Sequence, residues 1–182
     1  MKKIVLLVFI IMFSFFSKSY AEYDKLAYDF QFKGLEGGTI NLNDFQNKVI
    51  VVVNVASRCG FTNQYEDLQN LWENYKKKDL IVIGVPTNNF KQEPSSNKEI
   101  KEFCDTNFGI NFPMSEKTNV IGEDAHPFYL WAKKNYGKKA IPKWNFHKII
   151  INKDGKILDT FASITKPSSK RFINTINKEI TN

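Results

Sequence analysis

The run from Val49 to Ala56 is the feature that most constrains how this chain folds. It opens with five consecutive β-branched residues and carries no charge, which is typical of a strand buried on both faces of a parallel sheet. A second apolar run spans Leu80 to Val85, and between the two runs, at about 63–77, apolar and aromatic residues recur with helical spacing. This order predicts a strand, a helix and a second strand parallel to the first.

Cys59 follows the first run and precedes the predicted helix, whose N-cap we expect at Thr62. The cysteine therefore falls in a loop at the carboxyl end of a buried strand, near a helix N-terminus. The positive end of the helix dipole and the neighbouring Arg58 favour the thiolate form. A reactive thiol is one interpretation, and a small buried structural cysteine is the other.

The rest of the chain predicts further strands and helices. We expect an early hairpin (28–32 with 39–41), a helix capped by Asn97 that holds Cys104, a helix over 127–135, a hairpin (148–152 with 156–158) and a last helix at about 168–179. These elements predict an α/β domain, a mixed central sheet flanked by helices on both faces with an N-terminal β-hairpin. Their order resembles the thioredoxin fold.

The N-terminus has the pattern of a secretory signal peptide. Lys2 and Lys3 precede an uninterrupted apolar stretch, and small residues occupy Ser19 and Ala21, the −3 and −1 positions of a cleavage after Ala21. The stretch is shorter than a membrane span, although an uncleaved anchor stays an alternative. We therefore expect residues 1–21 to be a signal peptide, residues 22–182 to form one domain, and the protein to be exported, periplasmic or secreted.

Charge excludes one class of function. The formal net charge of the 182 residues is +7, and removal of residues 1–21 lowers it to +4 because three lysines and no acid are lost. The remaining lysines are scattered, without an arginine-rich arm or an aromatic-basic module. The sequence therefore predicts no nucleic-acid partner.

Cys59 and Cys104 are the two cysteines of the chain. In an exported protein they are able to form a disulfide at any stage, which by itself does not separate a structural from a catalytic role. Gly60, Phe61 and Thr62 follow Cys59, so the Cys-x-x-Cys motif of thioredoxin-like dithiols is absent.

Three spaced motifs resemble those of the glutathione peroxidase family, cysteine type. Residues 54–62 (NVASRCGFT) resemble its peroxidatic motif, residues 88–94 (NNFKQEP) its second motif, and residues 144–146 (WNF) its third, with Phe112-Pro113-Met114 in between. The blocks occur in the family's order across nearly the whole of residues 26–180. The chain is thus similar to the short, monomeric, thioredoxin-dependent bacterial members.

The resemblance implies a catalytic tetrad of Cys59, Gln92, Trp144 and Asn145. A thiolate attacks one oxygen of a hydroperoxide, so charge develops on the departing oxygen, and a proton must reach it. The two amides and the indole N–H are neutral donors that can stabilise the thiolate and orient the peroxide. Taken singly, these three residues have ordinary interpretations in a core, a turn or a surface. No cofactor and no metal are implied.

Two departures from the family pattern concern the second motif. The loop between Phe90 and Gln92 is one residue shorter than usual, and Thr87 replaces a frequent cysteine. Cys104 is then the one candidate for a resolving cysteine, with a buried helix cysteine as the alternative. The resemblance implies that Cys104 condenses with oxidised Cys59, and that a thioredoxin-like protein or a low-molecular-weight thiol restores both thiols.

The segment between His126 and Trp144 is short, whereas tetrameric relatives carry a long insertion there. We therefore expect a monomer with an open site that admits hydrogen peroxide and organic or lipid hydroperoxides, with transient contact to membrane lipid peroxides. The activity expected is hydroperoxide reduction as a response to oxidative stress. Rival interpretations are an exported thiol-disulfide oxidoreductase, a non-catalytic redox sensor of thioredoxin fold, and a peroxiredoxin, which the absence of a threonine two or three positions before Cys59 disfavours.

Overall fold

The computed structural model describes residues 23–93 and 95–181, so the predicted signal peptide lies outside the described residues. The helices and strands are α1 (Gln64–Tyr75), α2 (Asn97–Phe108), α3 (Pro127–Tyr136), α4 (Lys170–Thr181), β1 (Gln31–Lys33), β2 (Thr39–Asn41), β3 (Val49–Val55), β4 (Leu80–Pro86), β5 (Lys148–Ile151) and β6 (Ile157–Phe161), with short 3₁₀ turns at Ala27–Asp29, Leu42–Phe45 and Gly137–Ala140. No helix of the described part is long and apolar enough to cross a membrane.

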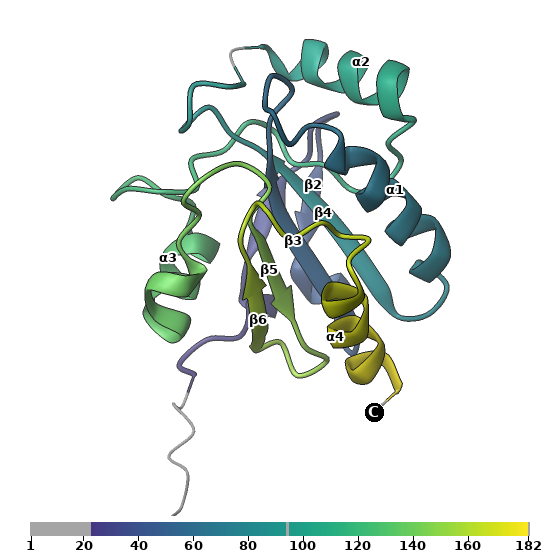
Figure 1. Ribbon diagram of the computed structural model, residues 1–182. Helices are drawn as coiled ribbons and strands as arrows, with labels where there is room; N and C mark the ends of the chain where they lie inside the picture. The colour runs from purple at the N-terminus through teal and green to yellow at the C-terminus, as the bar shows by residue number, and fades with distance from the viewer. Residues whose placement is uncertain (1–22, 94, 182) are drawn as a thin grey trace, which may run out of the picture.

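The central sheet has the strand order β4-β3-β5-β6. Strands β3 and β4 are parallel, whereas β5 is antiparallel to both β3 and β6. The mixed sheet and the parallel β3-α1-β4 unit are thus confirmed. The early hairpin, β1 with β2, forms a separate two-stranded sheet, and it is seen behind the central sheet in Figure 1.

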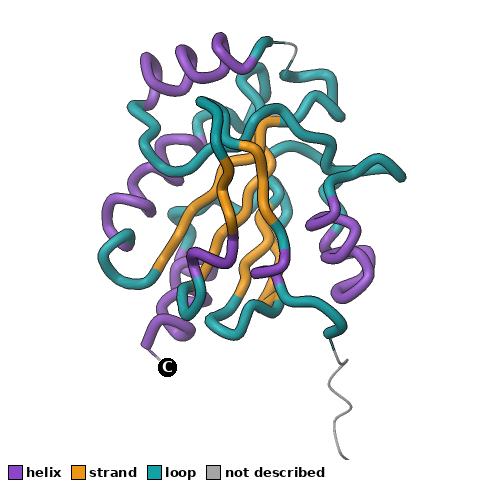
Figure 2. Tube along the Cα trace, turned by 180° about the vertical axis from the view of Figure 1, so that it is seen from behind, coloured by secondary structure: helices purple, strands orange, loops and turns teal. Residues whose placement is uncertain are grey.

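Helices cover both faces of the sheet, as predicted (Figures 1 and 2). Every residue of β3 is buried, and alternate residues along it enter two different core clusters. Val51 and Val53 pack with residues of α1, α2 and α4, whereas Ile50 and Val52 pack with residues of α3 and the hairpin. Successive side chains of a strand point to opposite faces. Because both faces of β3 are buried, apolar residues are favoured at consecutive positions along it.

Two predicted caps are wrong. Asn63, not Thr62, precedes α1, and it makes no side-chain cap hydrogen bond. Thr62 instead uses its hydroxyl within the Cys59 loop. Helix α2 is capped by Ser96, not by Asn97, because Ser96 Oγ and the Glu99 carboxylate exchange hydrogen bonds with each other's backbone N–H, a capping box.

The first predicted strand is shorter than expected. Residues Ala27–Asp29 form a 3₁₀ turn, closed by a 2.8 Å hydrogen bond from Leu26 N–H to the Asp29 carboxylate, and β1 begins only at Gln31. The alternation of apolar residues from Tyr28 continues across the turn, so periodicity alone could not locate the boundary.

Candidate active site

Cys59 lies in the loop between β3 and α1, five residues before Gln64, where α1 begins. The side chain is half-buried and its thiol is free. Its own N–H donates to Thr62 Oγ1 over 3.0 Å, and the sulfur accepts a hydrogen bond of 3.4 Å from Phe61 N–H. The sulfur therefore faces a backbone N–H donor in a loop that leads into the N-terminus of α1.

Thr62 holds this loop against the end of β3. Its hydroxyl donates to the Ala56 carbonyl over 3.1 Å and accepts the Cys59 N–H, while its own N–H donates to the Cys59 carbonyl over 3.0 Å. Thr62 thus holds the backbone before Cys59 through its hydroxyl and the Cys59 carbonyl through its own N–H. Because Thr62 lies just before the helix, where an N-cap residue is expected, the sequence did not reveal this role.

The second motif contacts the Cys59 loop through Gln92 and Glu93. The Gln92 carbonyl accepts Arg58 N–H over 3.1 Å. The buried Glu93 carboxylate accepts both the N–H and the hydroxyl of Ser57, over 2.7 and 2.8 Å. Burial raises the pKa of Glu93, and the two hydrogen bonds from Ser57 act in the opposite direction. Sequence reasoning missed Glu93, although it lies next to Gln92 in the second motif.

The third motif is attached to β3 through Asn54. Its side-chain amide donates to the Trp144 carbonyl over 3.1 Å, and its backbone carbonyl accepts Phe146 N–H. Asn54 is fully buried and is the one polar residue of β3. A buried amide inside a strand of valines was the sequence signal for this connection, because buried polar groups need partners.

Asn145 and Gln92 are in direct contact. The Asn145 side-chain amide donates to Gln92 Oε1 over 2.9 Å; Asn145 is fully buried and Gln92 is half-buried. The Trp144 indole is 41% exposed, and its ring lies 5.4 Å from that of Phe90. The three neutral donors of the predicted tetrad therefore come from two loops that meet at the ends of β3 and β4.

Within residues 23–93 and 95–181, the Cys59 sulfur has no hydrogen bond to the side chains of Gln92, Trp144 or Asn145. Catalytic hydrogen bonds are often long without substrate and tighten when it binds. The roles of the four residues therefore stay predictions.

Two residues beside the site adopt the left-handed backbone conformation. Lys91, immediately before Gln92, has φ 59°, and Phe146, immediately after Asn145, has φ 63°. Such values are uncommon for residues other than glycine, and they gather at functional sites. Lys91 lies in the shortened loop between Phe90 and Gln92, so this loop makes its turn with a residue other than glycine in the left-handed conformation.

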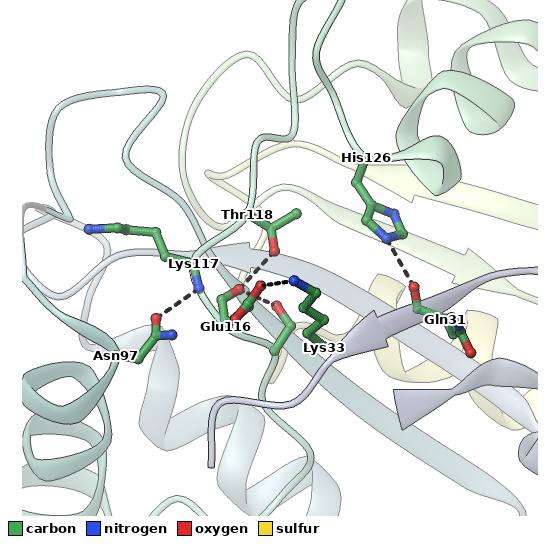
Figure 3. Close-up of polar contacts among 8 residues, drawn as sticks. Gln31, Lys33, Asn97, Glu116, Lys117, Thr118 and His126 are labelled. Carbon is green, nitrogen blue, oxygen red and sulfur yellow. Dashed lines mark hydrogen bonds and ion pairs between the residues drawn. The ribbon is translucent and has the colours of Figure 1, made fainter. Parts of the chain in front are cut away.

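Cys104 is a free thiol on α2, and it is almost fully buried. Burial raises the pKa of the Cys104 thiol to about 11. The helix is secured at both ends: Lys117 N–H donates to Asn97 Oδ1 over 3.0 Å (Figure 3), and Asn111, just beyond the other end, exchanges hydrogen bonds with Gln69 of α1. In the same view Glu116 pairs with Lys33 of β1 at 3.7 Å, which joins this loop to the hairpin.

Among the residues that the structure describes, no three His, Cys, Asp or Glu side chains gather in a way that could hold a metal ion. The site geometry thus consists of one thiol, backbone donors and neutral side-chain donors. Together with the mixed sheet, it defines a thiol-based redox protein of thioredoxin-like fold.

The chain belongs to the glutathione peroxidase family, whose model matches residues 27–133. It is 44% identical over 144 residues to a glutathione peroxidase of Lactococcus lactis, covering 77% of this chain and 91% of the relative. It is 39% identical over 156 residues to a hydroperoxy fatty acid reductase of Synechocystis, covering 81% and 92%. The apo crystal structure of Trgpx is similar with a TM-score of 0.69 and 33% identity, covering 87% of this chain and 97% of that one.

Proposed function

We propose that this protein is a thiol peroxidase that reduces hydrogen peroxide and organic or lipid hydroperoxides at Cys59. The observation that carries the proposal is the hydrogen bond from buried Asn145 to Gln92, whose backbone in turn binds Arg58 beside the thiol. Because Asn145 occupies Oε1 of Gln92, the Gln92 amide N–H₂ stays available as a donor. When the Cys59 sulfur attacks one peroxide oxygen and the O–O bond breaks, charge develops on the other, departing oxygen, which such a donor stabilises.

The cycle has three steps. The Cys59 thiolate attacks a peroxide oxygen and becomes a sulfenic acid, and the departing oxygen takes up a proton to give water or an alcohol. The Cys104 thiol condenses with the sulfenic acid to give a disulfide and water. A thioredoxin-like dithiol protein or a low-molecular-weight thiol then reduces the disulfide by exchange.

Helix α2 opens locally during the second step in this proposal. Cys104 is 1% exposed, and a disulfide requires Cα atoms within about 7 Å of each other. We expect faster amide hydrogen exchange over residues 97–107 in the oxidised protein than in the reduced protein. Identical protection in the two forms would contradict this step.

We also propose that the protein is a monomer and that it is exported after cleavage near Ala21. The lysines and the apolar stretch at the N-terminus support export. An exported enzyme cannot draw directly on cytosolic thioredoxin, so its reductant is an exported thioredoxin-like protein or a small thiol. N-terminal sequencing of the exported protein, and mass photometry or sedimentation of residues 22–182, test the two statements.

We further propose that lipid hydroperoxides with an anionic group are preferred organic substrates. A cavity of about 370 Å³ next to the third motif is lined by four cations, one acid and His147, namely Lys138, Lys139, Lys143, Arg171, Asp159 and His147 among others. Lys143 immediately precedes the exposed Trp144. Excess positive charge beside the site attracts anionic substrates and lipid surfaces.

The decisive experiment treats reduced residues 22–182 with one equivalent of hydrogen peroxide and measures intact and peptide masses. We expect a rapid loss of two hydrogens and a Cys59–Cys104 linked peptide, while Cys104→Ser stops at a sulfenic acid. Oxidation that is slow and unaffected by Cys59→Ser would refute the peroxidase. Thiol-disulfide exchange with proteins, without peroxide reduction, would support an oxidoreductase instead.

A further inference from the structure

The Tyr65 hydroxyl is a buried polar group without a hydrogen-bond partner among the described residues. Tyr65 is the second residue of α1 and is fully buried. An unpartnered buried hydroxyl costs about 1–3 kcal/mol, and phenylalanine would fill nearly the same volume without that cost. The hydroxyl therefore needs an explanation other than packing.

The Tyr65 ring lies between the third motif and the helix that carries Cys104. Its centroid is 5.3 Å from Phe146, edge to face, and 5.3 Å from Phe108, the last residue of α2. Phe108 is four residues after Cys104, so the two side chains share one face of α2. Tyr65 and Cys104 belong to one core cluster, against which the half-buried Cys59 packs.

The Tyr65 hydroxyl influences the pKa of Cys104. Burial raises the pKa of Cys104, and the Tyr65 hydroxyl beside the thiol acts in the opposite direction, although their contact does not meet hydrogen-bond geometry. Glu93 and Asp105 act as further raising influences on that pKa, and Lys101 as a lowering one. The pKa of Tyr65 is itself raised well above its ordinary value by burial and then by Cys104, with a smaller contribution from Cys59. The phenol therefore stays protonated.

The resolving cysteine needs a route for its proton. With a pKa of about 11, roughly one Cys104 thiol in ten thousand is ionised at pH 7, yet the thiolate is the nucleophile. A hydroxyl next to the thiol can accept the S–H proton while it gives up its own.

We propose that the Tyr65 hydroxyl relays a proton in the resolving step, an inference that rests on the proposed peroxidase cycle. The Cys104 sulfur attacks the sulfenic sulfur of Cys59, the S–S bond forms and the S–O bond breaks. The departing hydroxyl takes the phenolic proton and leaves as water, and the Cys104 proton restores the phenol. The sulfenic sulfur is reduced, the thiol sulfur is oxidised, and Tyr65 ends unchanged.

Tyr65 is connected to the Cys59 loop by backbone hydrogen bonds. It belongs to α1, and hydrogen bonds run from Tyr65 N–H to the Thr62 carbonyl and from Thr62 N–H to the Cys59 carbonyl, each 3.0 Å. The backbone of Tyr65 is therefore tied to the Cys59 loop by contacts that do not involve α2, so it stays with that loop when Cys104 approaches.

The test compares Tyr65→Phe with Tyr129→Phe. The Tyr129 hydroxyl is also buried without a partner, but Tyr129 is on α3 in the other core cluster, so both variants remove the same kind of group. After mixing with hydrogen peroxide, sulfenic acid formation should be equally fast in all three proteins. Disulfide formation should slow about 100-fold in Tyr65→Phe alone, the size of a general acid–base contribution.

A pH series separates the relay from a structural role. Without the hydroxyl, the resolving rate depends on thiolate formed beforehand, so it should rise about tenfold per pH unit from pH 6 to 9, more steeply than in the unaltered protein. A structural effect would change the rate and the amide exchange of α2 but not this slope. An unchanged rate or slope in Tyr65→Phe overturns the relay, whereas failure of peroxide to oxidise Cys59 overturns the proposed function.

Discussion

The Asn145 side-chain amide donates a hydrogen bond of 2.9 Å to Oε1 of Gln92. The two residues are 53 positions apart, and the bond fixes which end of the Gln92 amide faces away from Asn145. With the carbonyl oxygen engaged, the N–H₂ group is presented as a donor, the form that stabilises a thiolate or a departing oxyanion. Asn145 is therefore a positioning residue as well as a donor candidate.

Replacement of Asn145 by Ala should lower the second-order rate of Cys59 oxidation by hydrogen peroxide about 100-fold, similar to loss of one preorganised donor. Asn145→Asp should lower it further, because a carboxylate cannot donate to Gln92 and places negative charge beside the thiolate. Stopped-flow tryptophan fluorescence checks both. Asn135→Ala, at a helix residue that bonds Trp131, is the control and should react normally.

Thr62 should stabilise the Cys59 loop rather than cap helix α1. Thr62→Val keeps the shape but removes the partner of Cys59 N–H, so we expect a loss of about 1–3 kcal/mol in the free energy of unfolding and slower peroxide reduction. Thr62→Ser retains the hydroxyl and should restore most of both. Urea unfolding and peroxidase assays measure the effect; if valine proves neutral in both, the loop does not depend on this hydroxyl.

The sequence allowed the parts of the fold that follow from periodicity to be predicted. The continuous apolar run of β3 indicated a central strand, and the β3-α1-β4 order indicated the parallel unit, because burial on both faces leaves no alternation. Thr62 and Asn97 were misassigned because Ser, Thr and Asn bond to backbone in loops as readily as at helix starts. Which role is taken depends on contacts distant in sequence, such as Asn97 with Lys117.

Sequence reasoning found residues of the site only where they lie in motifs that resemble those of the family. Gln92, Trp144 and Asn145 were found by resemblance, whereas the buried Lys148 was not. Its ammonium binds Gln64 Oε1 and the Thr165 carbonyl, and burial lowers its pKa to about 7. Lysine is rarely buried, so only tertiary contacts could reveal that this one joins β5 to the start of α1.

Glu93 predicts a pH-dependent stability. Its pKa is raised by burial, so the folded state binds this proton more tightly than the unfolded state, and stability is lost as pH rises from about 4.5 through the folded pKa. Glu93→Gln keeps an acceptor for the Ser57 hydrogen bonds without titrating. Relative to the unaltered protein, its urea midpoint should increase between pH 4.5 and pH 7; equal midpoints throughout that window would contradict the assignment.

The cavity lined by Lys143 and Arg171 should favour a fatty acid hydroperoxide over its methyl ester. Because Lys143 and Arg171 line it, linoleic acid hydroperoxide should have a higher kcat/KM than its methyl ester, and Lys143→Gln with Arg171→Gln should reduce that ratio about fivefold, since exposed ion pairs contribute about 1 kcal/mol or less. Salt should reduce it too, while the rate with hydrogen peroxide stays constant. Lys98→Gln, on α2 outside this cavity, makes the same kind of charge change and should preserve the ratio. Equal rates for acid and ester in the unaltered protein would show that the cavity plays no part in substrate choice.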